Sequence, residues 1–288
     1  MKKKYILTNE TIQHKGHTLH RIKATKDFGN IKAGDLGGWV ESENNLLHKG
    51  NCWIYNEAKV YENAKVLNNA IVYGKAEVYG MAIILNDARV YDNAKVYCRA
   101  KVYCNAEVYD NARVLNNAQV YDNARVYGNA EVYGRAFVYN NALVHDNAQV
   151  NGCAQIYDNA KVYDNAKIGD NTKIHGGAKV SSDAIVWEDA EIFRLARVNG
   201  SAMIRGNAKI ESISDYIVFK NWWSSGRYFT WTRSNNMWSV GCFYGTGDEL
   251  IAKAYKDSKC SGEEYKRIVK YVKAISSKNF FKKLFCNL

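Results

Sequence analysis

The stretch Val90-Tyr91-Asp92-Asn93-Ala94-Lys95 is one copy of a six-residue unit that recurs without insertion or deletion from Ile54 to Ile210. Every sixth position in this range is Val or Ile. The residue four places after each of them is Ala in every unit but one, where it is Thr172. Because self-similarity at a short fixed period indicates stacked structural repeats, the sequence predicts a solenoid.

The spacing inside the unit predicts its local structure. Ala, the next residue and then Val form an in-out-in triplet, which is a very short strand with both apolar ends on one side. The other three residues must turn the chain. Three strands and three corners build a triangular coil of eighteen residues, so the repeat predicts about nine coils and, at about 4.8 Å per rung, a prism roughly 40 Å long.

Asn dominates the third corner position, as at Asn63, Asn93, Asn111 and Asn129. Since Asn is the residue other than glycine that best tolerates positive φ, we expect left-handed backbone there. The first corner position is most often Tyr and points outward.

The unit Ile168-Gly169-Asp170-Asn171-Thr172-Lys173 resembles the signature of the hexapeptide-repeat, LpxA-like superfamily. The resemblance implies an all-β solenoid, a single-stranded left-handed parallel β-helix. Periodicity alone does not determine the hand, and parallel crossovers elsewhere are overwhelmingly right-handed. Tyr at the first corner departs from the superfamily pattern, which prefers Gly, Ala, Glu or Asp there.

The segments on either side of the repeat differ from it in charge. Of the formal net charge of +11, residues 1–53 carry nine basic against five acidic residues, the repeat 18 against 18, and the remainder 13 against six. Basic ends keep nucleic acid or a membrane surface open as partners, beside the plainer interpretation of a solvated surface. We therefore expect three regions: 1–53, 54–213 and 214–288.

The first region reads as a small β cap with strands at Tyr5–Thr8 and Thr18–Ile22 and a turn at Lys15-Gly16. A solenoid needs a cap, because its terminal coil exposes unpaired backbone and an open core. The leading segment around Gly37-Gly38-Trp39-Val40 resembles that of YdcK-like and phage or prophage hexapeptide-repeat proteins. We expect its glycines to form tight turns that bring Trp39 and Trp53 over the open end.

The third region reads as a small α+β module with a basic tail. A strand at Tyr216–Phe219 and a hairpin turned at Ser234-Asn235-Asn236 precede two helices, with capping boxes expected at Thr246 and Ser261. The tail 280–285 is aromatic and basic, so it either continues the last helix or contacts a membrane surface or partner. Its candidate binding residues are aromatic and cationic, the types that dominate interfaces: Trp222, Trp223, Arg227, Trp231 and Arg233.

Residues eighteen apart stack on a prism, so the outward tyrosines form ladders on three edges. These ladders either stiffen a thin core of Val and Ala or offer a partner an aromatic surface. The first edge carries Tyr55, Tyr73, Tyr91, Tyr109 and Tyr127, then His145 and Tyr163; the second carries Tyr61, Tyr79, Tyr97, Leu115 and Tyr133; the third carries Leu67, Leu85, Tyr103, Tyr121, Tyr139 and Tyr157.

No motif identifies a catalytic residue, a metal ligand or a cofactor. Acyl transfer in the superfamily uses a His base, but His145 and His175 occupy ladder positions, for which the sequence supplies no partner or pocket. Cys242 could be a nucleophile, although a small buried residue is the plainer interpretation. Seven cysteines without a CxxC pair indicate free thiols in the cytoplasm.

Two functions stay open. The first is a non-enzymatic binding or scaffold protein, phage- or prophage-encoded by resemblance, with a macromolecular partner that we expect to be a protein. The second is an acyltransferase-like enzyme acting at the interface of a trimer. The oligomeric state is not set by the sequence.

Overall fold

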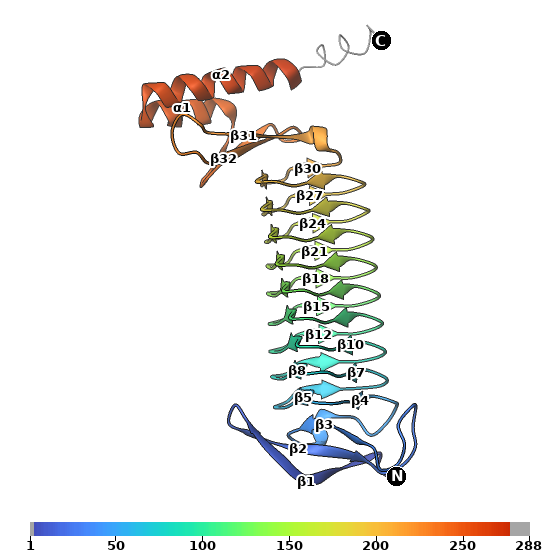
Figure 1. The fold of residues 1–288 in the computed structure, drawn as a ribbon. Helices are drawn as coiled ribbons and strands as arrows, with labels where there is room; N and C mark the ends of the chain where they lie inside the picture. Colours follow the sequence, from blue (N-terminus) through green and yellow to red (C-terminus); the bar gives the residue numbers. More distant parts are fainter. Residues whose placement is uncertain (1–2, 277–288) are drawn as a thin grey trace.

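The computed structural model describes residues 3–276 as a straight rod with a small module at each end (Figure 1). The rod begins at β4 (Trp53–Ile54), β5 (Lys59–Val60) and β6 (Lys65–Val66), and a two-residue strand recurs every six residues up to β30 (Lys209–Ile210). Each strand pairs in parallel with the strand eighteen residues further on, as Arg89 pairs with Glu107. Two faces are nine-stranded sheets, and the third joins nine such strands to β1, β2 and β3 of the cap. The predicted triangular prism of nine coils is confirmed.

The core of the prism contains the Val, Ile and Ala of the repeat. Their side chains are almost completely buried along the whole rod. Thr172, which replaces one Ala, is buried as well, and its hydroxyl donates to the carbonyl of Val186 at 3.2 Å. A buried hydroxyl is tolerated because it has this acceptor.

The corners differ from the prediction in which residue carries the positive φ. It is the second corner residue, such as Asp92 (φ 56°) or Asn116 (φ 60°), and not the third. The corner is a four-residue turn in which the Ala94 amide donates to the Tyr91 carbonyl at 3.2 Å. A turn with positive φ at its first central residue alone leaves the second in ordinary backbone. The expectation for the third-position Asn was therefore wrong.

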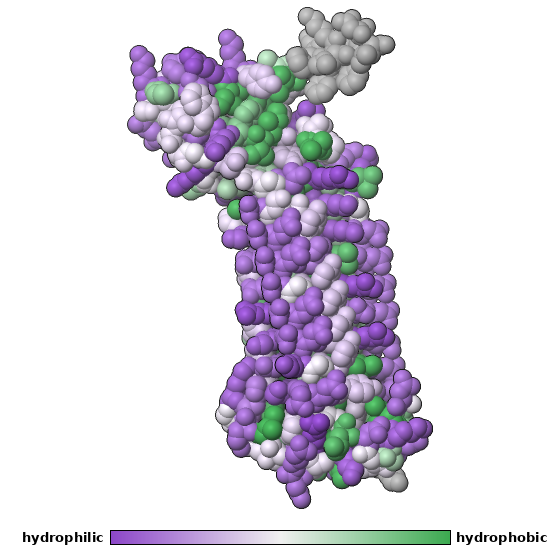
Figure 2. Space-filling view, in the orientation of Figure 1, coloured by the Kyte–Doolittle hydropathy of each residue, from purple (hydrophilic) through white to green (hydrophobic). Residues whose placement is uncertain are grey.

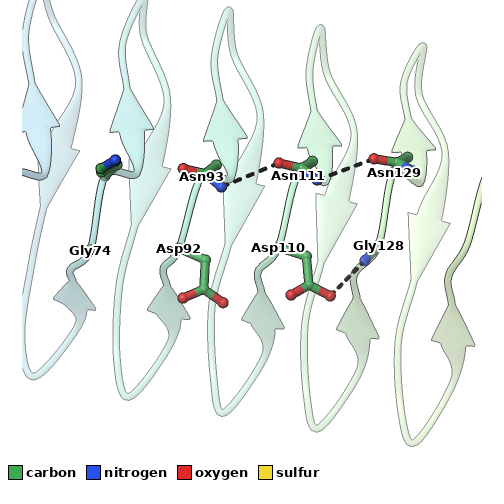
Figure 3. A pocket seen from close by; sticks show the side chains of 8 residues that line it. Gly74, Asp92, Asn93, Asp110, Asn111, Gly128 and Asn129 are labelled. Carbon is green, nitrogen blue, oxygen red and sulfur yellow. Dashed lines mark hydrogen bonds between the residues drawn. The ribbon is translucent and has the colours of Figure 1, made fainter.

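The third-position Asn side chains instead bond to one another along the rod. On the first edge, Asn93 donates to Asn111 at 3.3 Å, and Asn111 donates to Asn129 at 3.2 Å (Figure 3). The second-position Asp110 accepts the backbone amide of Gly128 at 3.0 Å, one coil further on. These side chains line a shallow groove along the edge. Their hydrogen bonds run from each coil to the next.

The N-terminal cap is a hairpin of β1 (Tyr5–His14) and β2 (His17–Ala24), continued by β3 (Leu36–Val40). Both hairpin strands are longer than predicted, and the turn at Lys15-Gly16 is confirmed. Gly37 and Gly38 lie within β3 and not in turns. A Cβ on Gly38 would come within 2.5 Å of Ile54, so glycine lets the cap backbone lie directly on the first coil. Trp53 is fully buried beneath it.

The C-terminal module contains an antiparallel sheet of β31 (Tyr216–Lys220), β32 (Tyr228–Thr232), β33 (Met237–Val240) and β34 (Phe243–Gly245). Two helices follow, α1 (Gly247–Asp257) and α2 (Lys259–Ser276). The capping box at Thr246 is confirmed. The one at Ser261 is not, because α2 begins two residues earlier and the Ser258 hydroxyl accepts the Ser261 amide. The tail 280–285 lies outside the described residues.

The module sits on the last coil of the prism. The amide of Met203 in β29 (Met203–Ile204) donates to the Thr230 hydroxyl at 2.9 Å. The amide of Lys209 donates to the Ser234 hydroxyl at 2.7 Å. Strand amides that would otherwise be left at the open end of the solenoid are thereby satisfied.

Candidate functional site

The tyrosines of the first edge form a continuous ring stack. Tyr73, Tyr91, Tyr109 and Tyr127 lie with ring centroids 4.6 to 4.9 Å apart and ring planes within 5° of each other. His145 and Tyr163 extend the stack at 4.7 and 5.2 Å. Because the rings lie face to face, each interior ring has both faces covered and exposes only its rim.

The third edge repeats this arrangement. Tyr103, Tyr121, Tyr139 and Tyr157 stack at 4.9 to 5.0 Å, and His175 and Phe193 continue the series. Burial raises the pKa of Tyr121 to about 12, so the phenols stay neutral at physiological pH. The second edge has a shorter stack of three rings, Tyr61, Tyr79 and Tyr97.

Tyr55 does not join the first-edge stack. Its ring packs partly against the core beneath the cap, and within residues 3–276 it makes no ring contact with Tyr73. A small pocket opens there between Tyr55, Ile71, Tyr73 and Arg89. The predicted ladder is therefore continuous only from Tyr73 onward, because the Tyr55 ring packs against the core beneath the cap.

Both ladder histidines have carboxylate neighbours that the sequence did not reveal. His175 Nε2 lies 3.1 Å from Glu191 Oε1, and its Nδ1 lies 3.9 Å from Asp158. His145 Nδ1 lies 3.0 Å from Asp146 in its own corner. Each ring is also held between two aromatic rings. Each histidine therefore lies beside a carboxylate and takes the place of a tyrosine in the ring stack.

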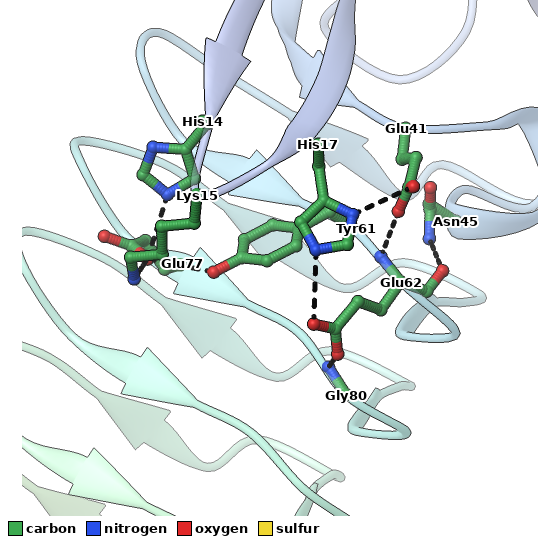
Figure 4. A network of polar contacts seen from close by, with 9 residues as sticks. All are labelled: His14, Lys15, His17, Glu41, Asn45, Tyr61, Glu62, Glu77 and Gly80. Atoms are coloured by element: carbon green, nitrogen blue, oxygen red, sulfur yellow. Dashed lines mark hydrogen bonds and ion pairs between the residues drawn. The ribbon is translucent and has the colours of Figure 1, made fainter.

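A polar cluster at the junction of cap and prism was missed by the sequence reasoning (Figure 4). The half-buried Glu77 carboxylate accepts from Lys15 at 2.6 Å and from Tyr61 at 3.2 Å, and it lies 3.3 Å from His14. His17 lies 3.0 Å from Glu41 and 3.5 Å from Glu62.

In this cluster the hydrogen bond from His17 lowers the pKa of Glu41. Glu62 accepts the Gly80 amide at 2.7 Å. Every carboxylate in the cluster therefore has a structural partner, and together they attach the tip of the hairpin to the second edge. Because the partners lie up to 63 residues apart, no local motif could have indicated this cluster.

The five predicted contact residues of the C-terminal module have different environments. Trp222 is 74% exposed, and Arg227 is exposed too. Trp223 packs edge-on against Tyr265 at 5.0 Å, and Arg233 is half-buried. Trp231 is 2% exposed and donates to Asn236, so it belongs to the module core and is not a surface contact. In Figure 2 the prism is mainly hydrophilic, while apolar colour gathers on the two end modules.

Residues 3–276 contain no group of three or more His, Cys, Asp or Glu side chains placed to hold a metal ion. No helix in that range is long and apolar enough to cross a membrane. Cys242 is exposed in the turn between β33 and β34, so the expectation of a buried residue was wrong. Cys98 and Cys104 are free, and they follow strands of two different sheets, β11 (Lys95–Val96) and β12 (Lys101–Val102).

Comparison with known proteins agrees with this architecture. The YdcK β-solenoid repeat matches residues 118–134 and 154–170. The Escherichia coli (strain K12) protein named "Uncharacterized acetyltransferase YdcK" is 43% identical over 42 residues, which is 15% of this chain and 13% of that protein. The match to this relative thus spans a small part of either chain. The chain is a β-solenoid of six-residue units, and two stretches of it match the YdcK repeat.

Proposed function

We propose that this protein is a non-enzymatic binding scaffold, phage- or prophage-encoded, in which a rigid prism presents its edges and two end modules to a protein partner. The observation that carries the proposal is the unbroken run of coils from β4 to β30, in which no residue is looped out to form a substrate pocket. Both histidines of the prism lie inside ring stacks.

The ring stacks support a mechanical role. Aromatic pairs in favourable geometry contribute about 0.5–1.5 kcal/mol each beyond burial. They lie on the same edges as the Asn ladders and the amide contacts of the corner Asp. The middle coils are therefore tied to one another by backbone, amide and ring contacts, which favours a stiff spacer between cap and module.

Of the five predicted contact residues of the module, Trp222 and Arg227 are exposed to a partner, while Trp231 is buried. The tyrosine edges offer rims and hydroxyls and not ring faces. Contacts at the edges would thus be polar, while the apolar contribution to binding would come from the module.

A second function, acyl transfer at the interface of a trimer, is favoured by one observation. His175 lies between the carboxylates of Glu191 and Asp158, and a positioned carboxylate is what a general base needs. The Escherichia coli relative is named an uncharacterized acetyltransferase, which is the same class of function.

Calorimetric titration with acetyl-coenzyme A, combined with a turnover assay on amine acceptors, separates the two functions. The scaffold proposal expects neither binding nor turnover. His175→Phe is the matched variant, because phenylalanine preserves the stack between Tyr157 and Phe193 and removes the base. Specific binding with turnover that is lost in His175→Phe, together with a trimer by sedimentation, would overturn the scaffold proposal.

A further inference from the structure

On each face of the prism, some outward-facing strand residues of opposite charge lie on neighbouring coils. Glu107 lies between Arg89 at 3.7 Å and Arg125 at 3.5 Å. Arg113 pairs with Glu131 at 3.0 Å on another face. Opposite charges on adjacent rungs are favourable, and like charges directly opposite are unfavourable.

Like charges meet once in the middle coils, at Lys95 and Arg113, but one row near the C-terminal end has three in succession. Lys161 in β22 (Lys161–Val162), Lys179 in β25 (Lys179–Val180) and Arg197 in β28 (Arg197–Val198) occupy three consecutive rungs in register. Among the described residues, none of the three has a carboxylate partner within ion-pair distance. Three like charges at about 4.8 Å spacing repel one another.

The corner beside this row breaks a second rule of the repeat. Its third position carries an amide ladder through Asn105, Asn123, Asn141 and Asn159. The same position in the next coils is Gly177, Leu195 and Ile213. Leu195 is 81% exposed and Ile213 is 65% exposed. The corner thus replaces bonded amides with unburied apolar side chains.

The two departures lie together, because Leu195 is two residues from Arg197. Residues that depart from the pattern of a repeat, and whose departure stabilises nothing in the fold, are expected at functional sites. Building on the scaffold function proposed above, we propose that Lys161, Lys179, Arg197, Leu195 and Ile213 form a docking surface, the corner patch, for an acidic, amphipathic protein segment. Carboxylates of the segment face the cationic row, and apolar side chains cover Leu195 and Ile213.

The exposed apolar pair distinguishes this partner from a nucleic acid. Phosphate backbones are bound through cations, with aromatic side chains that stack on bases. Leu195 and Ile213 offer neither charge nor a ring. Arg194, which adjoins them, is already paired with Glu211, so the free cations of this corner are those of the row.

Two substitutions restore the charge pattern and the corner residue found in the middle coils. Lys179→Glu gives the row the alternation seen at Arg89, Glu107 and Arg125, and Leu195→Asn gives the corner residue used in earlier coils. Both are expected to keep or raise Tm. Lys101→Glu is the control, since it makes the same charge change beside the neutral Ile83 and Gln119.

The experiment is fluorescence anisotropy on the full chain. The probes are a labelled peptide in which Leu alternates with acidic pairs, the same peptide with Ser for Leu, and a single-stranded oligothymidylate. We expect the acidic Leu peptide to bind best. Lys179→Glu and Leu195→Asn should each weaken it by about tenfold or more, while Lys101→Glu retains wild-type affinity.

No binding of the acidic Leu peptide, or equal loss in Lys179→Glu and Lys101→Glu, overturns the corner patch. Preferred binding of oligothymidylate that is insensitive to Leu195→Asn also overturns it, in favour of a phosphate-binding surface. These outcomes leave the scaffold proposal intact, because that proposal fails on acetyl-coenzyme A binding and turnover, which the peptide titration does not measure.

Discussion

The middle and the last coils of the prism follow the same core pattern and differ on the surface. In the middle coils, from about Tyr73 to Asn165, stacked rings, amide ladders and charge pairs link neighbouring coils. In the last coils the first-edge rings give way to Ser181 and Asn199, and the third-edge amides give way to Leu195. On the face that carries Arg89 and Glu107, the charge pairs give way to the cationic row. A constant core therefore allows the surface to vary coil by coil, and the proposed corner patch lies where it varies.

The largest effect is expected from Val126→Asp in the middle of the prism. Val126 is fully buried between two neighbouring coils, and an unpaired carboxylate there costs at least about 4 kcal/mol. Thermal unfolding followed by circular dichroism should show collapse of the prism. Arg125→Asp, one residue away on the outside, is the control and should melt close to wild type.

An equivalent substitution in the last coil, Ile210→Asp, tests whether the last coils unfold separately from the middle coils. Ile210 in β30 is as buried as Val126 but pairs with a single neighbouring strand, β27 (Glu191–Ile192). Ile210→Asp should release the C-terminal module while the middle coils stay protected in hydrogen exchange. Uniform loss of protection along the rod would show that the solenoid unfolds as one cooperative unit.

A smaller effect is expected from Tyr109→Ala. This change removes two ring stacks, with Tyr91 and Tyr127, each at 4.8 to 4.9 Å, and should cost about 1–3 kcal/mol in urea unfolding. Tyr133→Ala is the matched control, since within the described residues Tyr133 makes no ring contact and its hydroxyl only accepts from Asn151. Equal losses would contradict a stabilising role for the stacks.

The smallest expected effect is on the pH dependence of stability, through Glu41 beside the cap. The pKa of Glu41 is lower in the folded protein because His17 bonds to it, so the stability it contributes is present above the unfolded pKa. That stability is lost as pH falls through the folded pKa, below about 4.3. Between pH 5 and 3, wild type should lose more stability than Glu41→Gln; identical pH profiles would refute the linkage.

Prediction from sequence succeeded wherever a period determined the answer. The positions of the strands, the buried Val and Ala and the outward Tyr all follow from the six-residue spacing. It failed for the backbone conformation of the corners, and where a contact joins the repeat to a segment that does not repeat. The cap turns Tyr55 out of the ladder, and the module buries Trp231.

The sequence by itself therefore determined the prism, because alternation and a constant period dictate which side chains face inward. Its hand rests on resemblance to the hexapeptide-repeat superfamily. Only the tertiary structure decided that the second corner residue takes the positive φ, and that stacked rings cover one another's faces. It also decided that His14 and His17 meet glutamates of the second edge. These features depend on distances between coils and between modules, which side-chain periodicity along the chain does not specify.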